Sequence, residues 1–339
     1  MSARVLLNTL YVQTQGGYLR LDHDTVLLDI ERETVAQIPL HHLCGIAVFG
    51  NVLVSPYLLA RCARDGRALT WFSTSGRFNG RLAAPTSGNV LLRKAQFECA
   101  ADPARTERLA AEFVSGKLLA TISVLGRGFR DYSDDDLDRA RSQIRRLRSK
   151  LPAQEDIARI RGIEGRAARV YFAAFPKLLR ANDFCFTGRT KRPPRDPVNA
   201  ALSFTYALLG NDCAAALEGV GLDPQVGFLH AIRPGRPSLA LDLMEEFRSA
   251  FADRLVLTLL NRQQLQGADF DHRPGGAVLL NDRGRKTLLT AYESRKQEEI
   301  GHRLFKEQIP VGLLLHVQAR VLARCIRGEI DSYTPYRWR

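Results

Sequence analysis

The chain has 339 residues, enough for two domains that each bury a core, and 49 Lys and Arg against 36 Asp and Glu give a net charge of +13. No apolar run reaches the roughly 18 residues that cross a bilayer, and the N-terminus lacks a secretory signal pattern. The six cysteines stand singly, which argues against a thiolate zinc site and indicates reduced thiols. We therefore expect a cytoplasmic protein without a membrane segment, whose charge suits either nucleic-acid binding or solubility.

Residues 1–85 consist of short apolar runs broken by turn residues, which is typical of closely spaced hairpins. This pattern predicts a small β-sandwich or a twisted antiparallel sheet. Within it, residues 55–66 predict one helix, with Ser55 as the N-cap and Pro56 in the first turn. Two further strands are expected at residues 68–73 and 78–84. Residues 1–88 carry a net charge of only +2, which leaves +11 for the rest of the chain.

Residues 84–89 (APTSGN) form the clearest linker, and the apolar period becomes helical beyond them. Long amphipathic segments follow, interrupted once at residues 269–284 (DFDHRPGGAVLLNDRG), where a small hairpin is expected. The sequence thus predicts an α+β protein of two domains. A β-sandwich-like domain spans residues 1–85, and a larger all-α domain spans residues 86–339.

The segment SLALDLMEEFR, residues 238–248, places three carboxylates within five positions of one another in a basic chain. On a helical wheel Asp242, Glu246 and Asp253 lie opposite an apolar stripe, and Glu245 lies on its flank. Taken alone, the pattern indicates an amphipathic helix with a solvated acidic face. The other interpretation is that one or more of these carboxylates binds a ligand.

Glu164 differs, because it lies inside the apolar stripe of the helix predicted at residues 155–175. An ionised carboxylate among apolar neighbours is costly unless it gains a cation or hydrogen bonds. Gly162 and Gly165 flank it, and each lowers helix stability by about 1 kcal/mol relative to alanine. Two interpretations stay open, a buried pair with one of the many nearby arginines or a ligand-binding carboxylate.

His230 lies 12 residues before Asp242 and 15 before Glu245, at the start of a loop that leads into the acidic helix. A histidine near apolar residues is usually a packed side chain. One imidazole with two carboxylates, however, is a mixed nitrogen and oxygen donor set, which suits Mn²⁺ or Mg²⁺ better than a structural zinc.

Two loops concentrate basic side chains near these candidates. The segment TGRTKRPPRDPVNA contains Asp196 and Pro197, which predict the cap and first turn of a helix, and a basic loop at a helix start suits phosphate. The alternative is a solvated linker between helices. The candidate phosphate contacts in the two loops are Arg189, Lys191, Arg192, Arg195, Arg233 and Arg236.

These pieces, in this order, resemble the universal CRISPR-associated integrase, the first-numbered family of that series, over nearly the whole chain. Four motifs carry the resemblance: GIEGRAARVYF, RPPRDPVNAALSFTYALL, GFLHAIRPGRPSLALDLMEEFR and GRKTLLTAYESRK. The amino-acid sequences of the second and third motifs are most similar to those of family members found with subtype I-C systems.

The resemblance implies that Glu164, His230 and Glu245 bind one divalent metal ion, Mg²⁺ or Mn²⁺. Asp242 matches an additional acidic position of the catalytic site, and either Asp242 or Glu245 can be the third direct ligand. The flank position of Glu245 on the wheel favours Glu245. Glu246 matches no catalytic position and is expected at the surface.

The resemblance further implies a metal-dependent DNA endonuclease and integrase of antiviral defence. A 3′-hydroxyl of a captured DNA fragment attacks a phosphodiester of the CRISPR leader-repeat, and the fragment becomes a new spacer. The implied partners are double-stranded DNA, a second copy bound through the N-terminal domain, and a small ferredoxin-like CRISPR-associated dimer. Two other functions fit the residues, a metal-dependent DNA repair nuclease and a non-catalytic basic DNA-binding scaffold.

The C-terminal segment DSYTPYRWR, residues 331–339, alternates aromatic and arginine residues around Pro335, so it is not expected to be helical. Such anchors are frequent at interfaces and stack on unpaired bases. The sequence therefore predicts that the tail docks on a partner or on DNA and not on its own domain. A solvated end is the alternative.

Overall fold

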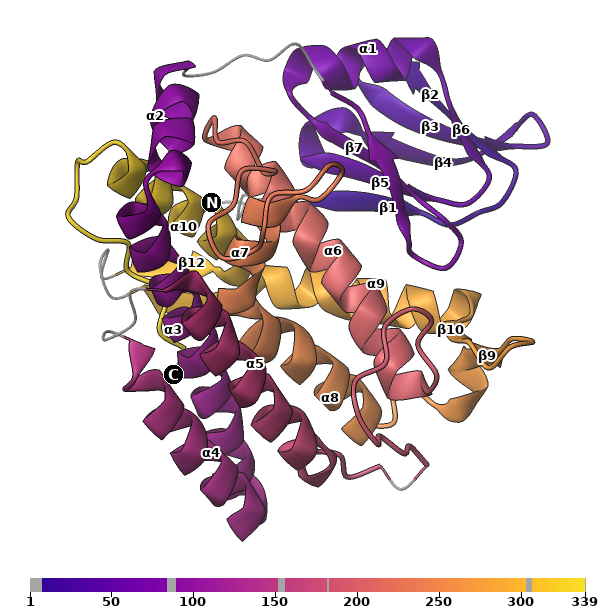
Figure 1. The fold of residues 1–339 in the computed structure, drawn as a ribbon. Coiled ribbons are helices and arrows are strands. Elements are labelled where there is room, and N and C mark those ends of the chain that lie inside the picture. Colours follow the sequence, from indigo (N-terminus) through magenta and orange to yellow (C-terminus); the bar gives the residue numbers. More distant parts are fainter. Residues whose placement is uncertain (1–7, 84–89, 152–155, 182, 303–306, 339) are drawn as a thin grey trace. The chain divides into compact units, whose positions relative to one another are not determined.

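Contacts within the chain divide it into two units. Unit 1 comprises Met1–Ser87 with Leu280–Leu313, and unit 2 comprises Gly88–Leu279 with Leu314–Arg339 (Figure 1). The computed structural model describes residues 8–83, 90–151, 156–181, 183–302 and 307–338. The predicted linker at residues 84–89 lies outside these ranges.

Unit 1 contains two four-stranded sheets and the helix α1. Its elements up to residue 81 are β1 (Thr9–Val12), β2 (Gly17–Asp22), β3 (Thr25–Ile30), β4 (Glu33–Pro39), η1 (Leu40–His42), β5 (Gly45–Phe49), β6 (Val52–Val54), α1 (Pro56–Asp65), β7 (Ala68–Phe72) and β8 (Phe78–Arg81). One sheet has the order β1-β5-β7-β8 and the other β4-β3-β2-β6. Buried residues of both sheets and of α1 form one hydrophobic core.

The sheets are mixed, whereas the hairpin pattern suggested antiparallel pairing alone. β1, β5 and β7 pair in parallel, and β2 pairs in parallel with β6. Parallel neighbours need a crossover connection, and α1 supplies it between the sheet strands β5 and β7. The prediction for α1 itself is confirmed: Ser55 Oγ accepts from Leu58 N, and Pro56 opens the helix.

A later segment of the chain completes unit 1. It consists of α9 (Asp282–Gln297) and the hairpin of β11 (Glu299–His302) and β12 (Glu307–Pro310), which the sequence pattern did not reveal. The Tyr11 hydroxyl on β1 donates to Glu293 Oε1 on α9 at 2.7 Å. Residues 280–313 therefore pack with the N-terminal unit, although they follow the helical segments in sequence.

Unit 2 is helical and holds all candidate site residues. Its elements are α2 (Val90–Ala101), α3 (Pro103–Tyr132), α4 (Asp135–Arg148), α5 (Ile157–Ala174), η3 (Phe175–Leu178), α6 (Pro197–Gly219), α7 (Ser238–Phe247), the π-helical turn η4 (Arg248–Asp253), α8 (Arg254–Asn261), η5 (Gly267–Asp269), β9 (Phe270–His272), β10 (Val278–Leu280) and most of α10 (Val311–Ile326). The predicted hairpin is confirmed as β9 and β10.

Helix α3 is the central element of unit 2, and α4, α5 and α7 pack against it (Figure 1). Within the described residues it is the one helix long and apolar enough to cross a membrane, since an 18-residue window has a mean hydropathy of 1.4. However, 67% of that window is buried inside the protein, as in the core helix of a helical domain.

The C-terminal tail packs on its own unit, so the prediction that it docks elsewhere is wrong. Tyr333, Tyr336 and Trp338 are at most 9% exposed. The Tyr333 hydroxyl and the Tyr336 N–H both donate to the Glu246 carboxylate, and Trp338 Nε1 donates to the Glu246 carbonyl at 2.8 Å. Gly116 on α3 admits the tail, because a Cβ there would lie 2.7 Å from Pro335 Cβ.

Glu246 is therefore buried, at 0% exposure, and its predicted surface position is wrong as well. The aromatic and arginine residues of the tail were interpreted as an anchor for a partner. Instead, Tyr333 and Tyr336 donate hydrogen bonds to the Glu246 carboxylate on α7. A buried carboxylate needs such donors.

We expect deletion of residues 332–339 to lower the free energy of unfolding by about 4 kcal/mol or more, because it removes three buried aromatic side chains and the Tyr333 and Tyr336 donors to the Glu246 carboxylate. Thermal and urea denaturation measure this. The matched control is Phe97→Ala, which removes an aromatic side chain that is 54% exposed on α2. Equal melting temperatures for the truncated and intact proteins would contradict the assignment of the tail to the fold.

Candidate metal centre

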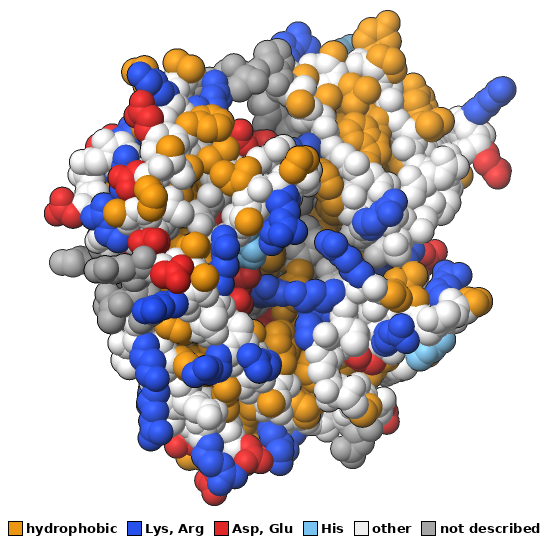
Figure 2. Space-filling model, in the orientation of Figure 1, with side chains coloured by type: hydrophobic (Ala, Val, Ile, Leu, Met, Phe, Trp, Pro, Cys, Tyr) orange, Lys and Arg blue, Asp and Glu red, His pale blue; other side chains and the backbone are white. Residues whose placement is uncertain are grey.

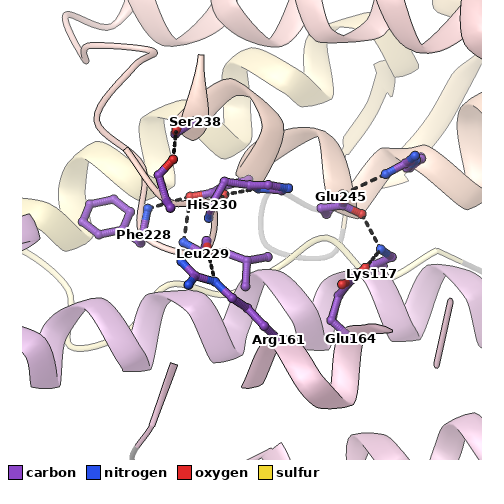
Figure 3. A network of polar contacts seen from close by, with 11 residues as sticks. Lys117, Arg161, Glu164, Phe228, Leu229, His230, Ser238 and Glu245 are labelled. Atoms are coloured by element: carbon purple, nitrogen blue, oxygen red, sulfur yellow. Dashed lines mark hydrogen bonds and ion pairs between the residues drawn. The ribbon is translucent and has the colours of Figure 1, made fainter. Parts of the chain in front are cut away.

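Two carboxylates from different helices face one ammonium group in unit 2. Glu164 on α5 forms a short ion pair with Lys117 on α3, and Glu245 Oε2 on α7 lies 2.9 Å from the same Nζ (Figure 3). Because α5 and α7 both pack against α3, residues that are far apart in sequence meet at one cation. The side chain of Glu164 is 27% exposed and that of Glu245 only 3%, so the pair opens to solvent on the Glu164 side.

The charges around Glu245 decide its ionisation. Burial alone would raise its pKa, but the positive charges of Lys117 and Arg248, with a smaller contribution from His230, lower the pKa to about 2. Arg248 Nη1 donates to Glu245 Oε1 at 3.0 Å. Oε2 is buried, and its partner is the lysine ammonium 2.9 Å away. Glu245 is thus an anionic donor with one oxygen directed at the shared cation.

Asp242 holds the loop that carries His230. It is fully buried, and its two oxygens accept from the backbone N–H groups of Phe228, Leu229 and His230 at 2.6–3.0 Å. Oδ1 also lies 2.6 Å from His230 Nδ1 (Figure 3). With Nδ1–H donating to this carboxylate, Nε2 is the nitrogen left for a ligand.

Further contacts fix the same loop from two sides. Arg161, one turn before Glu164 on α5, donates from Nε to the Leu229 carbonyl at 2.7 Å. Gln96 on α2 donates to the carbonyls of Asp223 and Val226 at 2.9 Å. Gly227 has no room for a side chain, since a Cβ would lie 2.7 Å from Ser238 and 2.8 Å from Asp242 Oδ2.

The donor set fits a hard divalent ion in kind. It offers two carboxylates that already meet at one cation, and one imidazole nitrogen. As the side chains stand, no group of three or more His, Cys, Asp or Glu residues within the described ranges lies close enough to hold a metal ion. The ammonium of Lys117 lies between the two carboxylates.

A buried network extends from Glu245 toward the basic loop at residues 188–196. The guanidinium of Arg248 lies 4.3 Å from the ring centre of Tyr206, and that of Arg189 lies 5.2 Å from it. The Tyr206 hydroxyl donates to Asp253, which also accepts from Tyr171 at 3.0 Å. Burial, aided by the charge of Asp253, raises the pKa of Tyr206, so its hydroxyl stays protonated as a donor.

The basic candidates divide into a structural residue and exposed residues. Arg189 is half-buried and donates to Asn199 Oδ1 at 2.6 Å and to Ser203 Oγ at 2.9 Å, so it organises the loop against α6. The side chains of Lys191, Arg192, Arg195 and Arg233 are exposed, and that of Arg236 is half-buried. The predicted cap of α6 is confirmed, because the Asp196 carboxylate accepts from Asn199 N at 2.8 Å.

Lys191 belongs to the electrostatic surroundings of the centre. Loss of hydration at its ammonium lowers the pKa of Lys191 although the residue as a whole is exposed, the charges of Arg248 and Arg189 lower it further, and Glu245 acts in the opposite direction. On the face drawn in Figure 2, Lys and Arg side chains gather around a histidine and acidic side chains near the position of α7. Among the exposed loop cations, Lys191 interacts electrostatically with Glu245.

Sequence reasoning brought out Glu164, His230, Asp242 and Glu245 but missed Lys117. The pattern that identified Glu164 could also have identified Lys117, because Lys117 is a charged residue in the buried stripe of α3, one turn from Phe113 and from Thr121. The expected partner of Glu164 was an arginine, and the structure provides a lysine. The solvated acidic face is wrong too, because Asp242, Glu245, Glu246 and Asp253 are all at most 2% exposed.

Comparisons with known proteins agree on one family. Residues 10–294 match the family model described as CRISPR associated protein Cas1. The chain is 49% identical over 341 residues to a CRISPR-associated endonuclease Cas1 of Moorella thermoacetica, covering 99% of both chains, and 44% identical to one of Rhodospirillum rubrum, covering 98% of this chain and 99% of that one.

Solved structures share the fold. A CAS1 protein from Thermotoga maritima superposes with a TM-score of 0.83 at 24% identity, covering 95% of this chain and 97% of that one. A casposase bound to its integration product gives a TM-score of 0.86 at 20% identity, with coverages of 98% and 95%. At these identities the likeness concerns the fold.

The geometry of Asp242 predicts that Asp242→Asn destabilises the protein by about 2–4 kcal/mol. One accepting oxygen becomes an NH₂ group that faces two N–H donors, so two buried hydrogen bonds are lost. Urea denaturation measures the loss. The matched control is Asp136→Asn on α4, whose side chain is 46% exposed, and less than about 1 kcal/mol is expected there. A change within 0.5 kcal/mol for Asp242→Asn would contradict the role given to this carboxylate.

Proposed function

The chain belongs to the Cas1 family of CRISPR-associated proteins, and from this premise we propose that it is a metal-dependent DNA endonuclease and integrase that inserts captured DNA fragments into a CRISPR array. The observation that carries the proposal is the meeting of the Glu164 and Glu245 carboxylates at one cation, in a unit whose loops at 188–196 and 231–237 carry exposed basic side chains. The relatives named above are endonucleases by name, and the casposase on the same fold was solved with an integration product.

Glu164, Glu245 and Nε2 of His230 would hold one Mg²⁺ or Mn²⁺ ion. Asp242 acts through His230: both of its oxygens are engaged by the loop, which supports Glu245 and not Asp242 as the third ligand. When bound, a divalent ion supplies positive charge to the phosphate and lowers the pKa of the attacking hydroxyl. These assignments follow the donor set, and subtype I-C membership stays a prediction from the motifs.

The chain's own residues position the DNA. Exposed side chains of the loops at 188–196 and 231–237 pair with backbone phosphates, with Lys191 next to the centre. A 3′-hydroxyl oxygen of the captured fragment then forms a bond to phosphorus while the bond to the leaving 3′-oxygen breaks, and the hydroxyl proton passes to the leaving oxygen or solvent. One phosphodiester replaces another, so no ATP is needed. With water as nucleophile, the same centre cleaves DNA.

We expect Glu164→Ala to reduce both cleavage and joining by more than about 100-fold, because even outer-shell partners of a metal cost about 10- to 100-fold when lost. DNA affinity should persist, since it resides in the basic loops. Cleavage, strand transfer and filter binding with Mn²⁺ or Mg²⁺ measure the three quantities. Glu98→Ala on the exposed face of α2 is the matched control, with a side chain that is 61% exposed.

The same assay separates integration from a repair nuclease and from a DNA-binding scaffold. Fragments with a 3′-hydroxyl should join to a leader-repeat duplex, and fragments with a 3′-deoxy end should not. Cleavage without joining would favour the repair nuclease. Unchanged turnover in Glu164→Ala would overturn the catalytic assignment.

We further propose a homodimer through unit 1 and assembly with a small ferredoxin-like dimer, in the cytoplasm. One structure of this fold, with a TM-score of 0.84, is a Cas6-RT-Cas1–Cas2 complex. Unit 1 has apolar surface to offer: Tyr18 and Leu53 are cross-strand neighbours on β2 and β6 and are 38% and 63% exposed, and Tyr57 on α1 is 79% exposed. Apolar side chains also gather on unit 1 in Figure 2.

Light scattering at micromolar concentration should therefore give twice the chain mass for the intact protein. Leu53→Glu should give a monomer, because it places a charge in the buried centre of the contact. Leu91→Glu on α2, at a residue 71% exposed in unit 2, is the matched control and should stay dimeric. A monomer for the unmodified protein would contradict the proposed dimer.

A further inference from the structure

Lys117 occupies a position that a lysine rarely takes. It lies within the buried stripe of α3 and is 8% exposed, although Lys is among the residues least often buried. Its Nζ reaches the Glu164 and Glu245 carboxylates. The charge of Lys117 therefore serves these two carboxylates.

The two carboxylates need a cation when no metal ion is bound. Two like charges that meet at one point repel, and an unpaired charge on the buried Glu245 costs several kcal/mol. Glu245 has a second cation in Arg248, on Oε1, but its Oε2 and the Oε1 of Glu164 are both directed at Lys117. These are the donors that the proposed function assigns to a divalent ion.

One location cannot hold the ammonium and the divalent ion together, because both are cations and both require the same oxygens. A lysine is suited to leave, since its point charge sits on a flexible four-carbon stem. Arg248 cannot exchange in this way. It is held by Glu245 on one side and by the Tyr206 ring on the other.

We propose that Lys117 is the resident counter-cation of the metal centre: it holds Glu164 and Glu245 together before the metal ion enters, and the ion displaces it. This inference rests on the proposed function. Lys117 is a positioning residue in this role. It stabilises the metal-free protein and weakens metal affinity, because every binding event must first break its two ion pairs.

The test compares two substitutions of opposite effect by Mn²⁺ titration calorimetry on the full chain without DNA. Lys117→Met removes the competing charge at similar length, so Mn²⁺ should bind at least about tenfold more tightly, while the metal-free protein melts at a lower temperature. Lys117→Arg keeps the charge and adds a planar fork that engages two carboxylates, so Mn²⁺ should bind about tenfold more weakly. Lys94→Met, at an exposed ion pair with Glu98, is the matched control and should change neither quantity.

The outcomes distinguish this inference from the proposed function. If Mn²⁺ binds the unmodified protein and Glu164→Gln abolishes binding, the metal centre stands. Unchanged or weaker Mn²⁺ binding by Lys117→Met would then overturn the counter-cation alone. If Lys117→Met does not fold, Lys117→Arg decides, and unchanged or tighter binding by that variant would overturn the inference. Absence of Mn²⁺ binding in the unmodified protein would overturn the proposed centre itself.

Discussion

Buried negative charge on α7 is the constraint around which unit 2 is assembled. Asp242, Glu245 and Glu246 are each at most 2% exposed, and each must be neutralised from a different direction. Asp242 takes backbone N–H groups of the loop before the helix, Glu245 takes cations of α3 and η4, and Glu246 takes donors of the C-terminal tail. A loop, a central helix and a chain end are thereby fixed to one helix.

Adjacent residues on this helix show how the kind of partner sets the charge. Glu245 faces Lys117 and Arg248, and its pKa falls to about 2 against the effect of burial. Glu246 faces only neutral donors from Tyr333, Tyr336 and Gln318, and burial raises its pKa to about 7 despite them. Formal charges therefore keep Glu245 anionic as a ligand, while hydrogen bonds suffice for the structural role of Glu246.

The sequence predicted correctly those features that depend on interactions between residues close together in the chain. The cap of α1 at Ser55, the cap of α6 at Asp196 and the hairpin of β9 and β10 depend on a few neighbouring residues, and all three were predicted. Glu164 stood out because a charge in an apolar stripe needs a partner. The identity of that partner could not be predicted, since Lys117 lies 47 residues away and only the packing of α3 with α5 joins them.

The wrong predictions for the acidic helix and the tail share one cause, because a helical wheel assumes that one face of the helix meets solvent. Helix α7 is enclosed on all sides, so its polar face meets protein donors instead of water. The tail was misjudged for the same reason: its aromatic residues serve an internal carboxylate that the wheel had placed outside. The partners in a buried polar network come from residues distant in sequence, and hydrophobic periodicity does not predict which residues these are.

The uneven exposure of the two carboxylates indicates where a phosphate could approach. Glu245 is closed in, whereas Glu164 is 27% exposed, on a helix whose Gly162 and Gly165 have open space where a Cβ would lie. Glycines cost helix stability, and here no close packing requires them. Arg166 and Arg169 are exposed on the same helix. The bare stretch of α5 beside these cations would let a charged backbone come within reach of Glu164, whereas the deeper Glu245 stays shielded from water. A centre built in this way keeps its electrostatics strong inside and is open to solvent on the α5 side.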